Sequence, residues 1–332
     1  MRINHAILIR TLPADRLENF VDDWLAQRCK DYHGHELWRG TGDMGRDVTG
    51  YVTSMRMEGV WDNYQCKQLN KALSESSAFT ELGKIFMHSA RGDYSLPRAY
   101  YFVAPLGVCR AVQQYIAHPE RFRSAFLTRW DTDIADKLVD KQKILLTPDI
   151  QNKINEFDFT KVYWLDSTKL ENDPFCKPIL VKWFNDDPGP SPRGVVPTEI
   201  HASESAYIGQ LLKLYSQKGP GDFRDVTEVM DSPYGPHLRD QRTRFFDSIA
   251  FERFYRDSTP TEYVDTFKDE IYHGVVEVHR DEYPNGMARL NQVMKQAASL
   301  QASGILGKYA GPQVKQGTCH QFANEGRLPW SL

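Results

Sequence analysis

The sequence lacks the features that mark secreted and membrane-spanning proteins. Its five cysteines are scattered and form no CxxC pair, which is typical of free thiols in a reducing compartment. No segment approaches the roughly 18 uninterrupted apolar residues that a membrane-spanning helix needs. The apolar run near the N-terminus is too short for a signal peptide. We therefore expect a soluble, cytoplasmic protein.

Several catalytic and binding patterns are also absent. No GxxxxGK[ST] segment is present, so the chain should not hydrolyse a nucleotide at a phosphate-binding loop of its own. The ten histidines show no HExxH spacing, and His33 with His35 is interpreted as a loop pair, which disfavours a zinc site. The net charge of −3 excludes a globally basic surface for nucleic acid, so any basic surface must be local.

The composition indicates a globular protein of two domains. Hydrophobic residues make up 41% of the 332 residues and charged residues 26%, which argues against disorder. Residues 185–197 (NDDPGPSPRGVVP) are rich in Pro and Gly and cannot continue a helix or a central strand. They mark either a domain boundary or a long surface loop within one domain. We predict domains at 1–185 and 199–332, joined by a linker at 186–198.

The first domain is predicted to mix helices and strands in an α/β, or α+β, core. Leu17, Phe20, Val21, Trp24 and Leu25 recur at the spacing of an amphipathic helix. A dense aromatic run near residue 100 predicts a buried strand. The expected strands are His35–Arg39, Asp47–Arg56, Val60–Lys67, Arg98–Pro105, Lys161–Leu165 and Lys177–Phe184, and the expected helices are Arg16–Lys30, Gln68–Phe86, Cys109–Phe126 and Asp131–Val139.

The second domain is predicted to be mostly α-helical, because its apolar residues recur at helical spacing. It also holds more aromatic residues than one small helical core usually requires, which favours a docking surface. The expected helices are Glu204–Gln217, Pro236–Arg256, one that starts at Ser258–Glu262, Gly286–Leu300 and Val314–Asn324, and the aromatic residues are Phe245, Phe246, Phe251, Phe254, Tyr255, Tyr263, Phe267 and Tyr272.

The segment 35–69 carries the residues with the clearest chemistry. Asp47 follows a glycine-containing turn, and two strand-like runs separated by Met57-Glu58-Gly59 end at Gln65-Cys66-Lys67. If the runs pair as an antiparallel hairpin, Asp47 lies beside Gln65 and Lys67. Strand side chains alternate, so Gln65 and Lys67 share a face while Cys66 points the other way. Such a corner suits a divalent metal and a hydrolytic water.

Other interpretations of this region stay open. The polar residues of the hairpin are also compatible with an ordinary solvated face, because Asp and Gln are common at strand ends. Asp43 is either an extra ligand or a cap of the turn. Glu18 lies beside the apolar stripe of the first long helix, on a turn that can overhang a neighbouring sheet.

The motif GDMGRD followed by YQCK, with LENFVDDWL upstream, resembles the PD-(D/E)XK restriction-endonuclease-like nucleases, and the Mrr-like group above all. The resemblance covers roughly residues 14–105. It implies a restriction-endonuclease-like fold in which Asp47 binds metal and Lys67 is the catalytic lysine. Gln65 holds a position more often filled by Glu or Asp, and Glu18 matches the helix glutamate that completes the site. The implied reaction is Mg²⁺-dependent hydrolysis of DNA, with Mn²⁺ as a substitute.

Phosphodiester hydrolysis fits these residue types. Mg²⁺ held by Asp47 compensates phosphate charge and activates water, and Lys67 orients the attacking water. The amide oxygen of Gln65 can bind metal but brings no charge. Metal affinity should therefore depend more on Asp47 and Glu18.

Three segments of the second domain, FYRDSTPTEYVDTFKDEIYHGVVEVH, GMARLNQVMKQAASL and VKQGTCHQFANEGRLPW, resemble the C-terminal domain of ABC-three-component proteins. The resemblance implies docking on an SMC-like ABC ATPase and a small middle subunit. With both the nuclease motif and this C-terminal domain, the chain resembles the nuclease effector subunit of Lamassu-type bacterial anti-phage and anti-plasmid systems. It implies double-stranded DNA as the substrate and a homo-oligomer, such as a tetramer, as the active form.

Two alternatives to the DNA endonuclease are kept. In one, the hairpin is a catalytically degenerate remnant, and the chain is a DNA- or protein-binding adaptor of the same kind of complex; Gln65 in place of an acid favours this. In the other, the substrate is RNA. Catalysis by the second domain is disfavoured, because neither Lys268–Glu270 with His273 nor Cys319-His320 sets a nucleophile beside a base in a recognisable turn.

Overall fold

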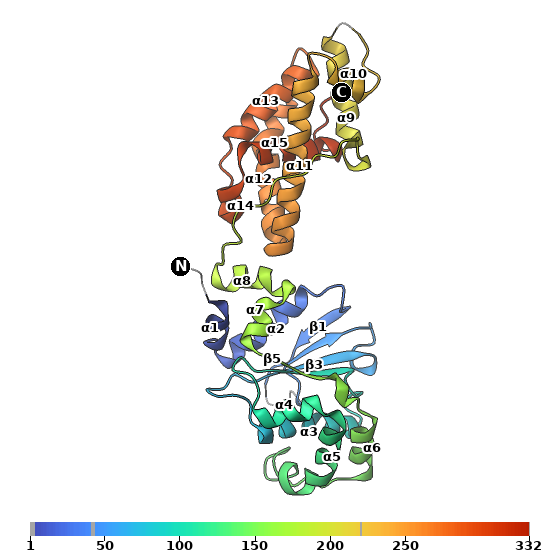
Figure 1. The fold of residues 1–332 in the computed structure, drawn as a ribbon, viewed down its shortest axis with the longest axis vertical. Coiled ribbons are helices and arrows are strands. Elements are labelled where there is room, and N and C mark those ends of the chain that lie inside the picture. Colours follow the sequence, from blue (N-terminus) through green and yellow to red (C-terminus); the bar gives the residue numbers. More distant parts are fainter. Residues whose placement is uncertain (1–3, 41–43, 220, 332) are drawn as a thin grey trace. The chain divides into compact units, whose positions relative to one another are not determined.

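The computed structural model describes residues 4–40, 44–219 and 221–331, and divides the chain into two units, Met1–Asp186 and Asp187–Leu332. The first is a mixed α/β unit and the second is helical, as Figure 1 shows. Among the described residues, no helix combines the length and the apolar character needed to cross a bilayer.

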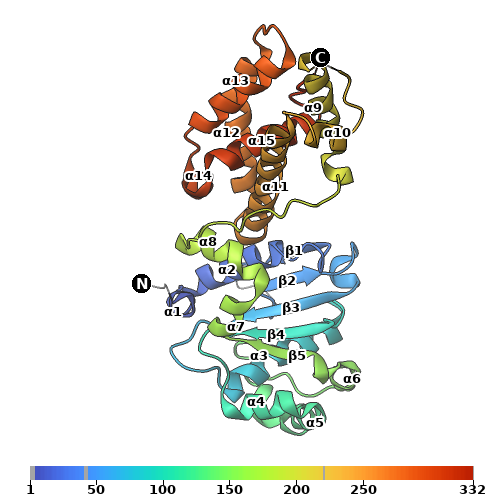
Figure 2. The ribbon, with the colours of Figure 1, turned by 45° about the horizontal axis from the view of Figure 1, so that its top comes forward.

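A five-stranded sheet organises the first unit, with its strands in the order β1-β2-β3-β4-β5 (Figure 2). The first three strands pair antiparallel, and the last three pair parallel. The strand bounds are β1 Gly34–Leu37, β2 Val48–Tyr51, β3 Trp61–Cys66, β4 Ala99–Val103 and β5 Val162–Leu165.

Helices cover both faces of this sheet, because strand residues of both alternating sets are apolar. Val48, Tyr64 and Cys66 pack toward α2 and α8, whereas Trp61 and Phe102 pack toward α3, α5 and α6 (Figure 2). The helices of the unit are α1 His5–Arg10, α2 Ala14–Ala26, α3 Glu75–Arg91, α4 Arg110–Ala117, α5 Pro119–Arg129, α6 Pro148–Glu156, α7 Ser167–Asn172 and α8 Lys177–Phe184, with short η1 Arg56–Glu58, η2 Trp130–Ile134, η3 Phe159–Lys161 and η4 Pro174–Cys176.

Local sequence signals explain where several of these elements lie. All five apolar residues of the stripe predicted at 17–25 are buried on α2, which confirms that prediction. The helix predicted from residue 68 begins instead at Glu75, because the Ser74 hydroxyl accepts a hydrogen bond from the Ser77 amide and caps it. The strand predicted over 47–56 ends at Tyr51, and η1 follows.

The segment KPILVKWF, predicted as a strand, forms α8, so that prediction is wrong. A continuous apolar run of this length does not distinguish a buried strand from a buried helix. Pro178 in the first turn is compatible with a helix start, and Asn185 closes the helix in the left-handed conformation. The side chains of Ile179 and Leu180 pack with those of α2.

The second unit is a helical bundle in which α11 packs along α15 and α12 along α13. Most of the aromatic residues singled out from the sequence pack into its core, and only Tyr263 is exposed, at 36%. The inference of an aromatic surplus was therefore wrong. The helices are η5 Ala202–Glu204, α9 Ser205–Lys218, α10 Val226–Met230, α11 Gly235–Ser258, α12 Thr261–Arg280, α13 Gly286–Ser299, α14 Gly304–Tyr309 and α15 Pro312–Asn324.

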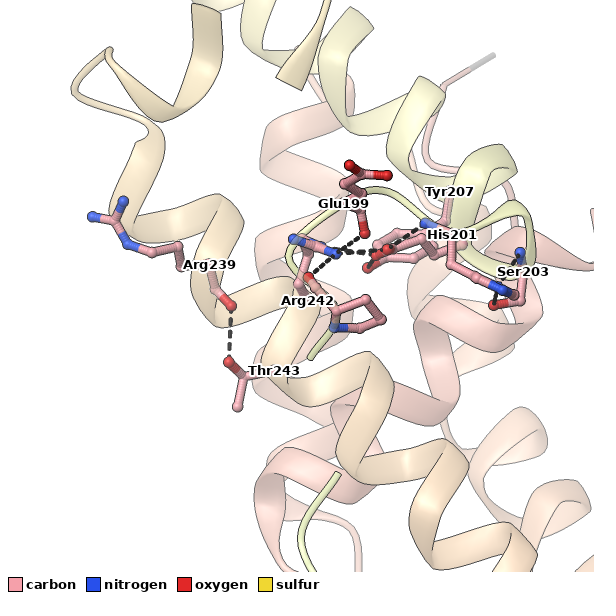
Figure 3. Close-up of polar contacts among 9 residues, drawn as sticks. Glu199, His201, Ser203, Tyr207, Arg239, Arg242 and Thr243 are labelled. Atoms are coloured by element: carbon pink, nitrogen blue, oxygen red, sulfur yellow. Dashed lines mark hydrogen bonds and ion pairs between the residues drawn. The ribbon is translucent and has the colours of Figure 1, made fainter. Parts of the chain in front are cut away.

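Residues 187–204 form a strap that is bonded to α11 at several points. The Tyr255 hydroxyl donates to the Gly189 carbonyl at 2.7 Å, and the Gly194 amide donates to Asp247 Oδ1 at 2.8 Å. Arg242 donates to the Pro197 carbonyl at 2.9 Å and pairs with Glu204 (Figure 3). Much of the predicted linker is thus held against the helical unit.

Candidate active site

Asp47 and Gln65 lie side by side, as the hairpin pairing led us to expect. Val48 of β2 faces Tyr64 of β3, which sets Asp47 opposite Gln65. The Gln65 side chain donates from Nε2 to Asp47 Oδ2 at 2.6 Å, and the Cys66 amide donates to the same oxygen at 2.7 Å. Both side chains are buried, at 6% and 1% exposure. The Asp47 carboxylate is therefore held by the adjoining strand.

The turn before Asp47 requires glycine at position 45. Gly45 has a φ of +82°, and a Cβ there would lie 2.9 Å from Lys84 Cβ. The Asn63 side chain donates to the Gly45 carbonyl at 3.3 Å, and the Trp38 amide donates to the Asp47 carbonyl at 2.8 Å. These contacts bring the turn close to α3. The glycine seen in the sequence thus has a packing reason as well as a conformational one.

Lys67 follows β3, and its side chain forms an ion pair with Glu81 of α3. The distance from Lys67 Nζ to Glu81 Oε1 is 3.1 Å, and that from Lys84 Nζ to Glu81 Oε2 is 3.0 Å. The Glu81 side chain is only 11% exposed. Sequence reasoning missed this residue. The sequence feature that could have revealed Glu81 is an acidic residue beside Leu82, on the buried stripe of an amphipathic helix.

Three buried polar atoms near these residues have no hydrogen-bond partner among the described residues. They are Gln65 Oε1, Asn63 Oδ1 and the Tyr100 hydroxyl. Burial raises the pKa of Tyr100 well above its ordinary value, and the nearby carboxylates of Glu81 and Asp47 raise it further. The hydroxyl therefore lies within the field of both acids. Native proteins leave few buried polar groups unpartnered, so such a cluster calls for an explanation.

Glu18 lies on α2, which covers the face of the sheet opposite α3. Cys66 points toward that helix, and burial raises the pKa of its thiol, with further contributions from Asp47 and Glu18. Glu18 is thus within electrostatic reach of Cys66, and its role as a ligand stays a prediction. Asp43 lies outside the described residues.

A divalent cation at Asp47 would need oxygen ligands in addition to this one carboxylate. Among the residues that the structure describes, no group of three or more His, Cys, Asp and Glu side chains could hold a metal ion. Mg²⁺, however, commonly takes one or two carboxylates and completes its shell with water. The Asp47 carboxylate and the unpartnered Gln65 Oε1 are oxygen donors of this kind. The donor set fits a hydrated hard cation and does not suit a closed zinc site.

Comparison with family models identifies part of the second unit. Residues 204–330 match CTD6, the C-terminal domain 6 of the ABC-three component (ABC-3C) systems. These residues of the second unit are therefore similar to CTD6 domains, and we refer to them as the CTD6 domain. The match indicates that the chain is a component of an ABC-three-component system. Comparisons with curated proteins and with solved structures found no match.

The CTD6 domain uses its buried histidine for structure. His320 lies between Gln241 Oε1, 2.9 Å from its Nε2, and the Trp330 indole, which donates to its Nδ1 at 3.1 Å. These partners fix the neutral tautomer with its proton on Nε2. Neighbouring Cys319 is fully buried, and burial raises the pKa of its thiol to about 12. Neither group suits catalysis at a surface, in line with the sequence argument.

Proposed function

We propose that the first unit is a Mg²⁺-dependent endonuclease of restriction-endonuclease-like fold that cleaves double-stranded DNA. The observation that carries this proposal is the convergence of Asp47, Gln65 and Lys67 on the α3 side of the sheet, with Gln65 Oε1 unpartnered. An aspartate, a neutral oxygen donor and a lysine are what metal-assisted phosphodiester hydrolysis requires.

Each residue has a distinct part in the proposed reaction. Asp47 binds the cation, with Gln65 as a neutral ligand and Glu18 as the acid expected from α2. Lys67 orients the attacking water and stabilises negative charge that develops on the phosphate. When bound, Mg²⁺ supplies Lewis acidity at the phosphate. The ion pair with Glu81 keeps the Lys67 ammonium fixed beside the site.

The match to CTD6 supports the proposal that this activity belongs to a multi-subunit assembly. As the component of a bacterial defence complex, the chain would dock through CTD6 on an SMC-like ABC ATPase and a small middle subunit. A nuclease without sequence specificity has to be restrained until it is needed. We therefore propose restraint within the complex in the cytoplasm, followed by release and assembly into a homo-oligomer, such as a tetramer, that brings active sites to both strands.

The test is plasmid cleavage by the purified chain in Mg²⁺, Mn²⁺ or EDTA, with an RNA substrate in parallel. Asp47→Ala and Lys67→Ala should each lower the cleavage rate by roughly 100-fold or more, because each removes a group that acts in the transition state. Lys71→Ala, which removes an exposed lysine four residues beyond Lys67, should cut like the wild type. Unchanged cleavage by both the Asp47 and the Lys67 variant would contradict the proposal.

One observation favours the adaptor as a second candidate. The acid position of the motif holds Gln65, whose amide group already donates to Asp47 at 2.6 Å. An adaptor would bind DNA or its partner subunits and cut no substrate with any divalent metal. The same plasmid assay, combined with a DNA-binding measurement at several salt concentrations, separates the two candidates.

A further inference from the structure

The proposed metal site is short of negative charge at the position where an acid is expected. Gln65 is neutral, so β2 and β3 supply one carboxylate, that of Asp47, whereas Lys67 and Lys84 bring two ammonium groups to the same side of the sheet. A divalent cation is repelled by such a net positive cluster. The repulsion between a cation and an ammonium group a few ångströms away is strong where water is largely excluded. Another carboxylate on the same face of the sheet would remove the deficit.

Glu81 has the position that this requires. Each of its carboxylate oxygens contacts one lysine, Lys67 at 3.1 Å and Lys84 at 3.0 Å. With Glu81 included, the two acids balance the two lysines. Its helix α3 covers the sheet face that bears Asp47 and Gln65, and the backbone carbonyl of Glu81 lies near Gly45, two residues before Asp47.

A second observation points to a ligand between these groups. Gln65 Oε1 and the Tyr100 hydroxyl are buried and have no hydrogen-bond partner among the described residues, although both side chains are at most 1% exposed. Tyr100 lies on β4 beside Asn63 of β3, on the sheet face that α3 covers, and Glu81 and Asp47 contribute to the rise in the pKa of its hydroxyl. A purely structural ion pair between Lys67 and Glu81 would not account for these unpartnered atoms.

We propose that Glu81 is the second acid of the site, and that it binds the divalent cation together with Asp47 and the neutral oxygen of Gln65. The acid that the motif usually places on the strand is thus supplied from α3. Glu18 approaches from the other face of the sheet, and this inference does not require it. The inference rests on the proposed nuclease function and deepens it.

The test measures Mn²⁺ binding to the full-length chain by calorimetry without DNA. Glu81→Gln keeps the shape of the side chain and removes its charge, so it should weaken Mn²⁺ binding by about tenfold or more. Gln65→Glu in that background returns one negative charge to the cluster and should restore binding. Gln65→Glu alone should bind Mn²⁺ more tightly than the wild type. Glu75→Gln is the matched control, because Glu75 lies on the same helix and pairs with Arg129.

Plasmid cleavage is measured on the same preparations. Cleavage and Mn²⁺ binding should fall together in Glu81→Gln and recover together in the double variant. A wild type that binds Mn²⁺ and cuts DNA, beside a Glu81→Gln variant with unchanged Mn²⁺ affinity, overturns this inference alone. Binding that is lost in Glu81→Gln and not restored by Gln65→Glu also overturns it. A wild type that neither binds the metal nor cuts DNA overturns the proposed function.

Discussion

The buried polar clusters around Arg242 and around Asp47 differ in how completely their hydrogen bonds are made. In the CTD6 domain, Arg242 and Glu204 are almost inaccessible, and their charged atoms meet one another and nearby carbonyls. In the first unit, the cluster around Asp47 retains unpartnered atoms on Gln65 and Tyr100 among the described residues. A completed cluster holds a fold together, whereas an incomplete one is where a ligand can contribute the missing partner.

The Arg242 cluster joins α11 to the strap, which lies 38 to 45 residues earlier in the chain at the contacting positions. Arg242 Nε donates to Glu204 Oε2 at 2.9 Å, and its Nη2 donates to Glu204 Oε1 at 2.7 Å and to the Pro197 and Glu199 carbonyls (Figure 3). The exposed fractions of the two charged side chains are 5% and 0%. The Arg242 guanidinium on α11 thus holds the strap at two carbonyls and at Glu204, the last residue before α9.

The largest effect is expected from breaking the completed cluster. Arg242→Ala leaves the Glu204 carboxylate buried without its cation, which should lower the stability of the CTD6 domain by about 3–5 kcal/mol. Amide hydrogen exchange of peptides from 189–204 and 235–258 would report the loss in this domain separately from the first unit. Arg239→Ala, on the exposed side of the same helix, should change stability by less than about 0.5 kcal/mol. Equal exchange rates in the two variants would show that the Arg242–Glu204 cluster does not stabilise the domain.

For the cluster around Asp47, the sequence predicted the residues of the hairpin but not Glu81 of α3. The hairpin follows from two strand-like runs and a short connection, and period-two alternation correctly set Gln65 and Lys67 apart from Cys66. Glu81 was missed because a residue 14 positions beyond Lys67 reaches it only through the packing of α3 on the sheet. Pairwise spacing along one chain carries no information on such a contact.

The second unit shows the same limit. Helical periodicity located its long helices to within a few residues, because their buried stripes recur at three-to-four spacing. The strap was not predictable, since Pro and Gly mark the end of regular structure without showing what the segment binds. Gly194 illustrates this: a Cβ there would lie 2.2 Å from the Phe246 carbonyl carbon, so the glycine allows close contact with α11.

The second largest effect concerns pH and the completed hydrogen bonds of His320. Burial, together with smaller contributions from Arg244 and His237, lowers the pKa of His320 to about 3. The unfolded chain therefore binds a proton below its ordinary pKa of about 6.5 that the folded domain does not bind. Stability should fall as the pH drops through 6.5 and level off near 3, and the His320 contribution between pH 7.5 and 5 is about 2 kcal/mol.

Urea unfolding of wild type and His320→Gln at several pH values measures that contribution as a difference in slope. The variant lacks the titrating group, so its stability should depend less on pH over this range. Parallel slopes for the two proteins would show that the imidazole does not remain neutral in the folded domain. Arg239→Ala again provides the control, because it removes no group that titrates between pH 5 and 7.5 and should leave the slope unchanged.

The smallest effect compares one tyrosine from each unit, and its expected sign differs between the two. The Tyr255 hydroxyl donates to the Gly189 carbonyl at 2.7 Å, so Tyr255→Phe should cost about 1 kcal/mol. The Tyr100 hydroxyl is buried without a hydrogen-bond partner among the described residues, so Tyr100→Phe should stabilise the first unit by about 1 kcal/mol in EDTA. Hydrogen exchange of β4 and of the strap resolves the two changes. Destabilisation by both variants would mean that the Tyr100 hydroxyl is already satisfied, and that the site near Asp47 is as complete as the one around Arg242.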